Sequence, residues 1–196
     1  MANLKSKIKG GFTLSELIIV ISIIGVITAI ASNTYRNQRV QVEFTDSLTT
    51  VVSMIKTARN YAVTSRMAYD GGELSVPPEG YGIYINSNTG EFILFANVGS
   101  DPNAYDGSND DVIEEEYTLP NNTVFEDMLS DSCDGSSGVD EVVIIFRPPL
   151  ADASIIDGVG DTMNTLYMRL SRAGSPAGVY KCIHMNRTAG FPEIDL

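Results

Sequence analysis

Twenty consecutive residues near the N-terminus, 12–31, contain a single charged side chain, Glu16. As an α-helix with a rise of about 1.5 Å per residue, this segment spans roughly 30 Å, the thickness of the hydrocarbon core of a bilayer. A carboxylate costs on the order of 2.5–3.5 kcal/mol at the centre of that core and less near the end of the helix, where Glu16 lies. We therefore predict that the segment crosses a membrane and that Glu16 has a compensating partner.

Charge divides the chain into a basic start and an acidic remainder. Residues 1–69 hold eight Lys and Arg against three Asp and Glu, whereas residues 70–196 hold five against twenty-two. Lysines precede the apolar segment without an acid among them, so the positive-inside rule predicts that residues 1–11 stay in the cytoplasm and that the rest crosses. The acidic remainder repels phosphate, and nucleic-acid binding by it is therefore disfavoured.

A helical pattern continues past the apolar segment without an intervening proline. Apolar residues recur at steps of four and three, which predicts one buried face of a helix. These residues are Phe44, Leu48, Val51, Ile55, Ala58 and Ala62. We expect one helix over residues 12–66, with an apolar half at 12–31 and an amphipathic half within 32–69.

Residues 70–196 are predicted to form an acidic globular domain rich in β-strands. Strand-like runs at 81–85 and 91–95 flank a short turn that ends in Gly90, which predicts a β-hairpin. Further β-rich runs lie at 116–119, 141–146, 166–170 and 179–185. The polar stretches 99–111 and 130–138 are expected to be exposed loops. The predicted fold class is α+β, with the second half of a long helix packed on a mostly antiparallel sheet.

Three common kinds of protein contain such an apolar segment. A secretory signal peptide would end at the A-x-A sequence Ala29-Ile30-Ala31 and release a secreted acidic binding protein, but its apolar region normally has about 7–15 residues. A plain single-pass anchor would give Glu16 no purpose. A buried helix of a soluble protein would not need twenty residues with only one charged side chain.

The residues around Glu16 fit a fourth possibility. The sequence Gly11-Phe12-Thr13-Leu14-Ser15-Glu16, preceded by Lys5, Lys7 and Lys9 and followed by the apolar segment, resembles the class III leader of type IV pilins and pseudopilins. The resemblance implies a leader peptide at 1–11, cleavage by prepilin peptidase between Gly11 and Phe12, and methylation of the new Phe12 amine. It also implies the pilin fold, and an assembly role in which Glu16 neutralises the N-terminal amine of its own or a neighbouring subunit.

Pilins and pseudopilins are structural proteins, so the resemblance implies a non-enzymatic subunit of a type IV pilus or a type II secretion pseudopilus. The implied partners are other pilin subunits, the prepilin peptidase and methyltransferase, the lipid bilayer and a membrane assembly platform. A separate ATPase would drive assembly, because no Gly-rich phosphate loop follows a predicted strand here. The precursor would be a single-pass inner-membrane protein, and the assembled globular domain would be extracytoplasmic.

Weaker similarities point to the H-type minor pseudopilins and their pilus-biogenesis relatives. They cover residues 44–66, 81–83, 144–148 and 186–190. The chain departs from that group where Pro149-Leu150 replaces an expected glycine and Gly190-Phe191 replaces a Gly-Arg pair. A major pilin of an adhesive or DNA-uptake pilus, or another minor pilin, therefore remains open.

Two cysteines, Cys133 and Cys182, both lie in the part predicted to be exported. In an oxidising compartment an even number of cysteines favours a disulfide, here one that closes a loop of about fifty residues. Two buried free thiols are the alternative.

Catalytic and metal sites have little support in the sequence. His184 is the sole histidine and has no further ligands at a recognisable spacing, and with one histidine and no cysteine near a base a nucleophilic triad has little support. The acidic loop partly resembles a calcium loop, with Asp106, Asp110 and Asp111 as candidate ligands, although its order does not fit an EF-hand. We expect no cofactor and a solvated acidic loop, and a non-EF calcium site in this loop is the alternative.

Overall fold

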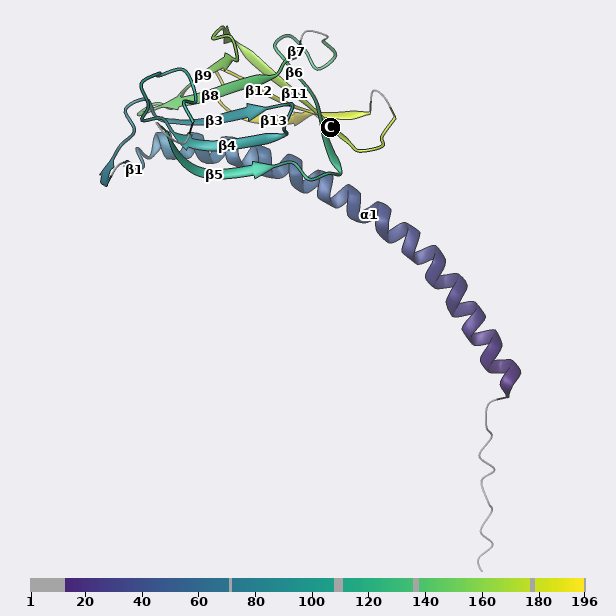
Figure 1. The fold of residues 1–196 in the computed structure, drawn as a ribbon. Coiled ribbons are helices and arrows are strands. Elements are labelled where there is room, and N and C mark those ends of the chain that lie inside the picture. The colour runs from purple at the N-terminus through teal and green to yellow at the C-terminus, as the bar shows by residue number, and fades with distance from the viewer. Residues whose placement is uncertain (1–12, 71, 108–110, 136–137, 177–178, 196) are drawn as a thin grey trace, which may run out of the picture. The chain divides into compact units, whose positions relative to one another are not determined.

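The computed structural model describes residues 13–70, 72–107, 111–135, 138–176 and 179–195. The chain forms two compact units, Met1–Val40 and Gln41–Leu196. Helix α1, Leu14–Val63, begins in the first unit and ends in the second, and Figure 1 shows that it precedes the strands.

The strands all belong to the second unit. In chain order they are β1 Ala68–Asp70, β2 Glu73–Ser75, β3 Tyr81–Asn86, β4 Glu91–Ala96, β5 Val112–Thr118, β6 Thr123–Leu129, β7 Gly138–Val139, β8 Glu141–Arg147, β9 Asp152–Asp157, β10 Thr162–Met163, β11 Thr165–Arg172, β12 Tyr180–Asn186 and β13 Pro192–Asp195. They form a two-stranded sheet β1-β2, a six-stranded sheet β10-β9-β8-β3-β4-β5 and a five-stranded sheet β13-β12-β11-β6-β7. Their pairings are antiparallel, so the α+β prediction is confirmed, with two large sheets in place of one.

The amphipathic part of α1 packs into a core that it shares with both large sheets. The six apolar residues of its predicted face are all buried: Phe44, Leu48, Val51, Ile55, Ala58 and Ala62. They belong to one cluster with residues of β3 and β8 in the first large sheet and of β11 and β12 in the second. The helical spacing therefore identified the core face correctly.

The predicted hairpin is also present. Strands β3 and β4 pair from Tyr81 opposite Ala96 to Asn86 opposite Glu91. Gly90 closes the turn with a φ of 67°, a left-handed conformation that glycine adopts without a steric cost. The runs predicted at 141–146, 166–170 and 179–185 correspond to β8, β11 and β12, and the run at 116–119 overlaps β5.

The helix ends three residues earlier than Arg66, the predicted end. Ser65 has a φ of 47°, its N–H donates to the carbonyl oxygen of Ala62, and the N–H of Arg66 donates to that of Tyr61. These two bonds form a Schellman motif, which satisfies the last carbonyl groups of a helix and stops it. Glycine is the usual residue at the left-handed position, and a serine there does not mark the end of a helix in the sequence.

The loop before β5 covers the outer face of the six-stranded sheet. That face carries a second, smaller cluster formed by Ile93, Phe95, Val143, Ile145 and Ile156. Tyr105 of the loop packs on it, with its ring centroid 4.9 Å from that of Phe95. Asp111, at the end of the loop, is only 4% exposed. The prediction of an exposed loop at 99–111 is therefore wrong for these residues, because strands that are apolar on both faces need a second cover.

Candidate functional site

The first part of α1 is an exposed apolar helix. By length and composition Leu14–Ser32 could cross a membrane, and none of it is buried within the protein. The hydroxyl groups of Ser22, Thr28 and Ser32 donate to carbonyl oxygens four residues earlier, at 2.8, 2.8 and 2.9 Å. Such bonds satisfy polar groups that would otherwise be unpaired in lipid, so the segment suits a hydrocarbon environment.

Glu16 occupies the first turn of this helix, where it forms a capping box with Thr13. The N–H of Thr13 donates to Oε2 of Glu16 at 3.0 Å, and the N–H of Glu16 donates to Oγ1 of Thr13 at 3.3 Å. This reciprocal pair satisfies two backbone N–H groups, one on Thr13 before the helix and one on Glu16 in its first turn. The capping-box pattern Thr-x-x-Glu is present in the sequence, but the prediction of an assembly role for Glu16 did not take helix capping into account.

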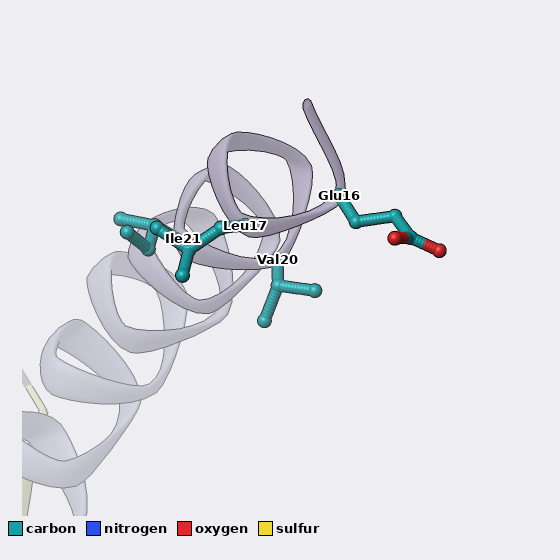
Figure 2. Close-up of a pocket in the computed structure, with 4 residues that line it drawn as sticks. All are labelled: Glu16, Leu17, Val20 and Ile21. Atoms are coloured by element: carbon teal, nitrogen blue, oxygen red, sulfur yellow. The ribbon is translucent and has the colours of Figure 1, made fainter. Parts of the chain in front are cut away.

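One oxygen of Glu16 remains available after capping. The hydrogen bonds of its carboxylate within the described chain are made by Oε2, which also accepts the hydroxyl of Thr13 at 3.0 Å. Figure 2 shows the carboxylate extending away from the helix on the side of Val20, with Leu17 and Ile21 on the other side; the four residues line one open, largely apolar surface. A cation that approached this surface would meet a carboxylate oxygen at the edge of an otherwise apolar helix.

The predicted cleavage and methylation residues, Gly11 and Phe12, lie outside the described residues. Their roles stay predictions. The first described residue, Thr13, is the N-cap of α1, so the helix begins two residues after the predicted scissile bond.

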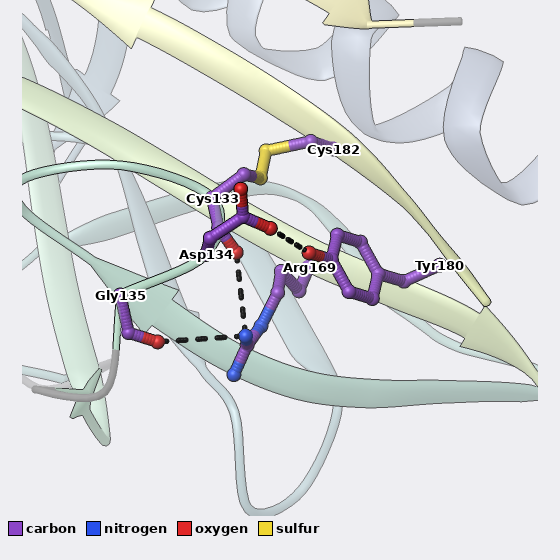
Figure 3. The surroundings of a disulfide bond; sticks show 6 residues. All are labelled: Cys133, Asp134, Gly135, Arg169, Tyr180 and Cys182. Atoms are coloured by element: carbon purple, nitrogen blue, oxygen red, sulfur yellow. Dashed lines mark hydrogen bonds between the residues drawn. A yellow bond between two sulfur atoms is a disulfide. The ribbon is translucent and has the colours of Figure 1, made fainter. Parts of the chain in front are cut away.

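The predicted disulfide between Cys133 and Cys182 is present in the structure. The two Cα atoms lie 6.3 Å apart, and the residues are separated by 49 positions in the sequence. The bond joins the loop after β6 to strand β12 (Figure 3). It therefore fixes a loop to the five-stranded sheet in the manner expected from the sequence.

Arg169, on β11, holds the same loop from the other side of the bond. Its guanidinium donates to the carbonyl oxygens of Cys133 at 3.3 Å and Gly135 at 3.5 Å, and forms an ion pair with Asp127 at 3.1 Å. The hydroxyl of Tyr180 donates to Asp134 of the loop, as Figure 3 shows. These contacts describe a structural anchor, because two carbonyl groups and one carboxylate of the loop are used to hold it on the sheet.

The candidate calcium ligands have other partners where they are described. Oδ1 of Asp111 accepts the N–H groups of Val98 and Gly99 at 3.2 and 3.1 Å, and its Oδ2 accepts that of Asp106 at 2.8 Å. Asp106 in turn accepts the N–H of Asp101 at 3.2 Å. Asp110 lies outside the described residues. The carboxylates that are described therefore organise the loop by binding its backbone.

His184 contacts a carboxylate on the neighbouring strand. Its Nε2 lies 3.6 Å from Glu193 of β13. Across the described parts of the chain, no three His, Cys, Asp or Glu side chains lie close enough to share a metal ion.

Comparison with protein families gives one match. The prokaryotic N-terminal methylation motif matches residues 6–32, which include Gly11, Phe12, Glu16 and the apolar segment. No curated protein and no solved structure matches the chain. Residues 6–32 therefore carry the sequence pattern of prokaryotic N-terminal methylation, and the part of that pattern from Leu14 onward belongs to the exposed apolar helix.

Proposed function

We propose that this chain, whose N-terminus carries the methylation motif of type IV pilins and pseudopilins, is a non-enzymatic structural subunit of a type IV pilus or type II secretion pseudopilus. The observation that carries the proposal is the match over residues 6–32, with a carboxylate in the first turn of an exposed apolar helix. The acidic β-rich unit that follows would be the extracytoplasmic part of the subunit.

Processing would convert a membrane precursor into an assembly-competent subunit. The lysines of residues 1–11 hold the leader in the cytoplasm, and removal of that leader leaves the apolar helix in the bilayer. The new N-terminus at Phe12 is then an ammonium group on an apolar helix, which is costly to bury unless it is paired. Glu16 has a free carboxylate oxygen to pair with it, on its own or on a neighbouring subunit.

The test is mass spectrometry of the mature N-terminus, after expression in cells that contain a prepilin peptidase. We expect a chain that begins with methylated Phe12. The matched control is Gly11→Val, which we expect to remain uncleaved, because a bulky residue prevents close approach of the backbone to the protease.

A secreted acidic binding protein is the rival function. It would be cleaved by ordinary signal peptidase after Ala31, and its mature chain would begin at Ser32. That N-terminus, unaffected by Gly11→Val, would refute the pilin proposal.

Within the pilin family we infer a minor subunit similar to the H-type pseudopilins. Residues 144–148 and 186–190 support this assignment by their similarity to that group. The amount of this chain in sheared filaments, relative to the other pilins, tests it. A small fraction supports a minor subunit, whereas a filament composed mainly of this chain would make it the major pilin.

A further inference from the structure

A cavity of about 600 Å³ lies at the β9 end of the six-stranded sheet, within the second unit. Its walls come from the last turns of α1, the turn before β9, β9 itself and residues 187–190. Arg59, Arg147 and Arg187 line it, and we call it the arginine pocket. Arg147 and Arg187 are two of only five Lys and Arg among residues 70–196, which hold twenty-two acids, so their meeting with Arg59 of α1 at one place is unexpected.

Arg147 is engaged by the surrounding protein through all three nitrogens of its guanidinium. It forms an ion pair with Glu79 at 3.4 Å and donates to Ser154 at 2.8 Å. It also donates to the carbonyl oxygen of Pro102 at 2.7 Å and to the side chain of Asn103 at 2.9 Å. Its role is to hold the wall of the pocket in place.

Arg59 and Arg187 keep donors unused. The guanidinium of Arg59 stacks on Phe191, 4.0 Å from the ring centroid, and its Nε is buried without a hydrogen-bond partner. Arg187 donates from Nε to the carbonyl oxygen of Ala153 at 3.2 Å. The ion pairs of the described residues involve neither Arg59 nor Arg187. Two positive charges therefore face one cavity without a bound carboxylate.

The turn that carries Arg187 is fixed in its conformation. The N–H of Arg187 donates to the carbonyl oxygen of Asn164 at 2.8 Å, and that of Gly190 donates to Asn186 at 2.9 Å. A Cβ atom at Gly190 would lie 3.3 Å from Nε of Arg59, so the glycine allows the arginine to pack closely against the turn. The pocket is thus formed before any ligand arrives, which lowers the entropic cost of binding.

We propose, on the basis of the filament function above, that the arginine pocket binds a carboxylate of a neighbouring copy of this chain. The guanidinium fork matches the two oxygens of a carboxylate and can bind both at once. Asp152 on the cavity wall and the excess of acids in residues 70–196 disfavour long polyanions such as nucleic acid or an anionic bilayer. A single side-chain carboxylate on a protein strand avoids most of that repulsion.

The same sheet supplies the carboxylates at its opposite edge. Strand β5 is the edge strand far from β9, and it exposes Glu115 and Glu116, whereas Glu114 is paired with Arg66 at 3.0 Å. Figure 1 shows β5 and β9 on opposite sides of the second unit. A contact between the β5 edge of one copy and the arginine pocket of the next is heterologous, and such contacts repeat into helical filaments when the rotation does not close.

The test is cross-linking between two tagged forms of the full-length chain, both in detergent micelles and in cells that assemble filaments. One form carries Leu150→Cys, an exposed position on the pocket wall, and the other carries Thr118→Cys, an exposed position on β5. The two native cysteines are joined in a disulfide, so a bismaleimide reagent reacts with the introduced thiols alone. We expect a cross-linked heterodimer in excess of the control pair Leu150→Cys with Glu126→Cys, whose exposed glutamate lies on the other large sheet.

Charge changes then separate pocket binding from general attraction. Arg187→Glu in the first form should reduce the cross-link about tenfold or more, whereas Arg172→Glu, which changes net charge equally outside the pocket, should not. Adding Glu115→Arg and Glu116→Arg to the second form should restore the cross-link to the Arg187→Glu form. This rescue excludes misfolding of Arg187→Glu as the cause of its loss.

A cross-link no stronger than the control pair, in cells where the processed chain enters filaments normally, would overturn the pocket contact and leave the filament function intact. Cleavage after Ala31 would overturn the filament function, and the cross-link in micelles would still decide the pocket contact on its own. Binding of the chain to phosphatidylglycerol vesicles that is lost with Arg187→Glu, without any cross-link, would assign the pocket to lipid headgroups and also overturn the proposal.

Discussion

Tyr81 shows how one buried side chain joins the end of the helix to the first large sheet. It is 1% exposed, its hydroxyl donates to the carbonyl oxygen of Arg66 at 3.1 Å, and its ring packs edge-on against Tyr61 at 5.3 Å. Burial is the largest cause that raises the pKa of Tyr81 to about 12, and the charge of Glu114 adds to it while that of Arg66 opposes it. The phenol must stay protonated for the bond to persist.

Tyr81→Phe should therefore change stability differently at neutral and alkaline pH. Near pH 7 the loss of one hydrogen bond should lower the free energy of unfolding by about 1 kcal/mol. Because the folded pKa exceeds the unfolded value, wild-type stability from this group is present below about pH 10 and is lost as the pH rises towards 12. Denaturant unfolding of the chain in micelles at pH 7 and above should show a smaller alkaline loss for the variant, and equal losses would contradict this account.

Asp111 is a second buried group. Burial disfavours the charged form of its carboxyl, whereas hydrogen bonds from the backbone favour it. Burial raises the pKa of its carboxyl, the N–H groups of Asp106, Gly99 and Val98 lower it, and the charge of Asp106 raises it further. The net direction is upward. At a pH just above the usual pKa of an aspartate, the folded state therefore binds more protons than the unfolded state.

Asp111→Asn should be destabilising because its amide would face the N–H of Asp106 with a donor in place of Oδ2. The expected loss is about 1–3 kcal/mol. The advantage of the wild type should be greatest at acidic pH and shrink as the pH rises from about 4 through the raised pKa. Unfolding titrations across this range, with exposed Asp131→Asn as the control, measure it, and an advantage that grows with pH would refute the assignment.

At the scale of elements, residue spacing predicted the elements with a clear periodic pattern and missed the strands without one. The buried face of α1 and the β3-β4 hairpin follow from patterns within a few neighbouring residues, and both are present. Strand β6, Thr123–Leu129, was missed because Glu126 and Asp127 interrupt its apolar residues. Strand β9 was missed because it begins and ends in aspartates, and β7 and β10 are two residues long. Strand β6 pairs with the distant β11, whereas β9 pairs with the adjacent β8 and β10 pairs with β9, so these strands are defined by packing in the sheet rather than by a clear pattern of their own residues.

The disulfide is the element-scale feature with the clearest energetic consequence. A cross-link between residues 49 positions apart restricts the unfolded chain, and removal by Cys133→Ser with Cys182→Ser should cost about 2–4 kcal/mol of unfolding free energy. Arg169 should keep the loop partly docked, so the fold should persist.

Mass spectrometry gives the direct check of the bond itself. The oxidised chain should gain two hydrogens on reduction, and its native form should resist alkylation. Equal masses before and after reduction, with both thiols alkylated in the native protein, would show that the bond does not form.

At the scale of the whole molecule, the two candidate sites differ in how far the sequence could reveal them. The proposed cleavage site and Glu16 form a linear motif, so both could be predicted from six adjacent residues, 11–16. The arginine pocket joins Arg59 on α1 to Arg187, which folding brings together across most of the chain. The similarity at residues 186–190 marked that turn, but nothing in the sequence paired it with the helix.

The assembly role of Glu16 can be separated from its role in helix capping. Glu16→Ala removes both the charge and the acceptor for the N–H of Thr13, whereas Glu16→Gln removes the charge and keeps an acceptor suited to a capping box. Both variants should insert in the membrane and be cleaved, since the bond between Gly11 and Phe12 is unchanged and a neutral helix is cheaper to insert.

If Glu16 pairs with the Phe12 amine of a neighbouring subunit, both variants should be nearly absent from filaments. An unpaired buried ammonium costs roughly 3–5 kcal/mol, whereas loss of a cap costs about 1 kcal/mol. The measurement compares processed chain in the membrane with chain recovered in sheared filaments, for each variant expressed beside the wild type. Normal incorporation of Glu16→Gln with a deficit for Glu16→Ala alone would reassign Glu16 to helix capping. Normal incorporation of both would leave it no part in assembly, because neither its charge nor its cap would then be needed to hold a subunit in the filament.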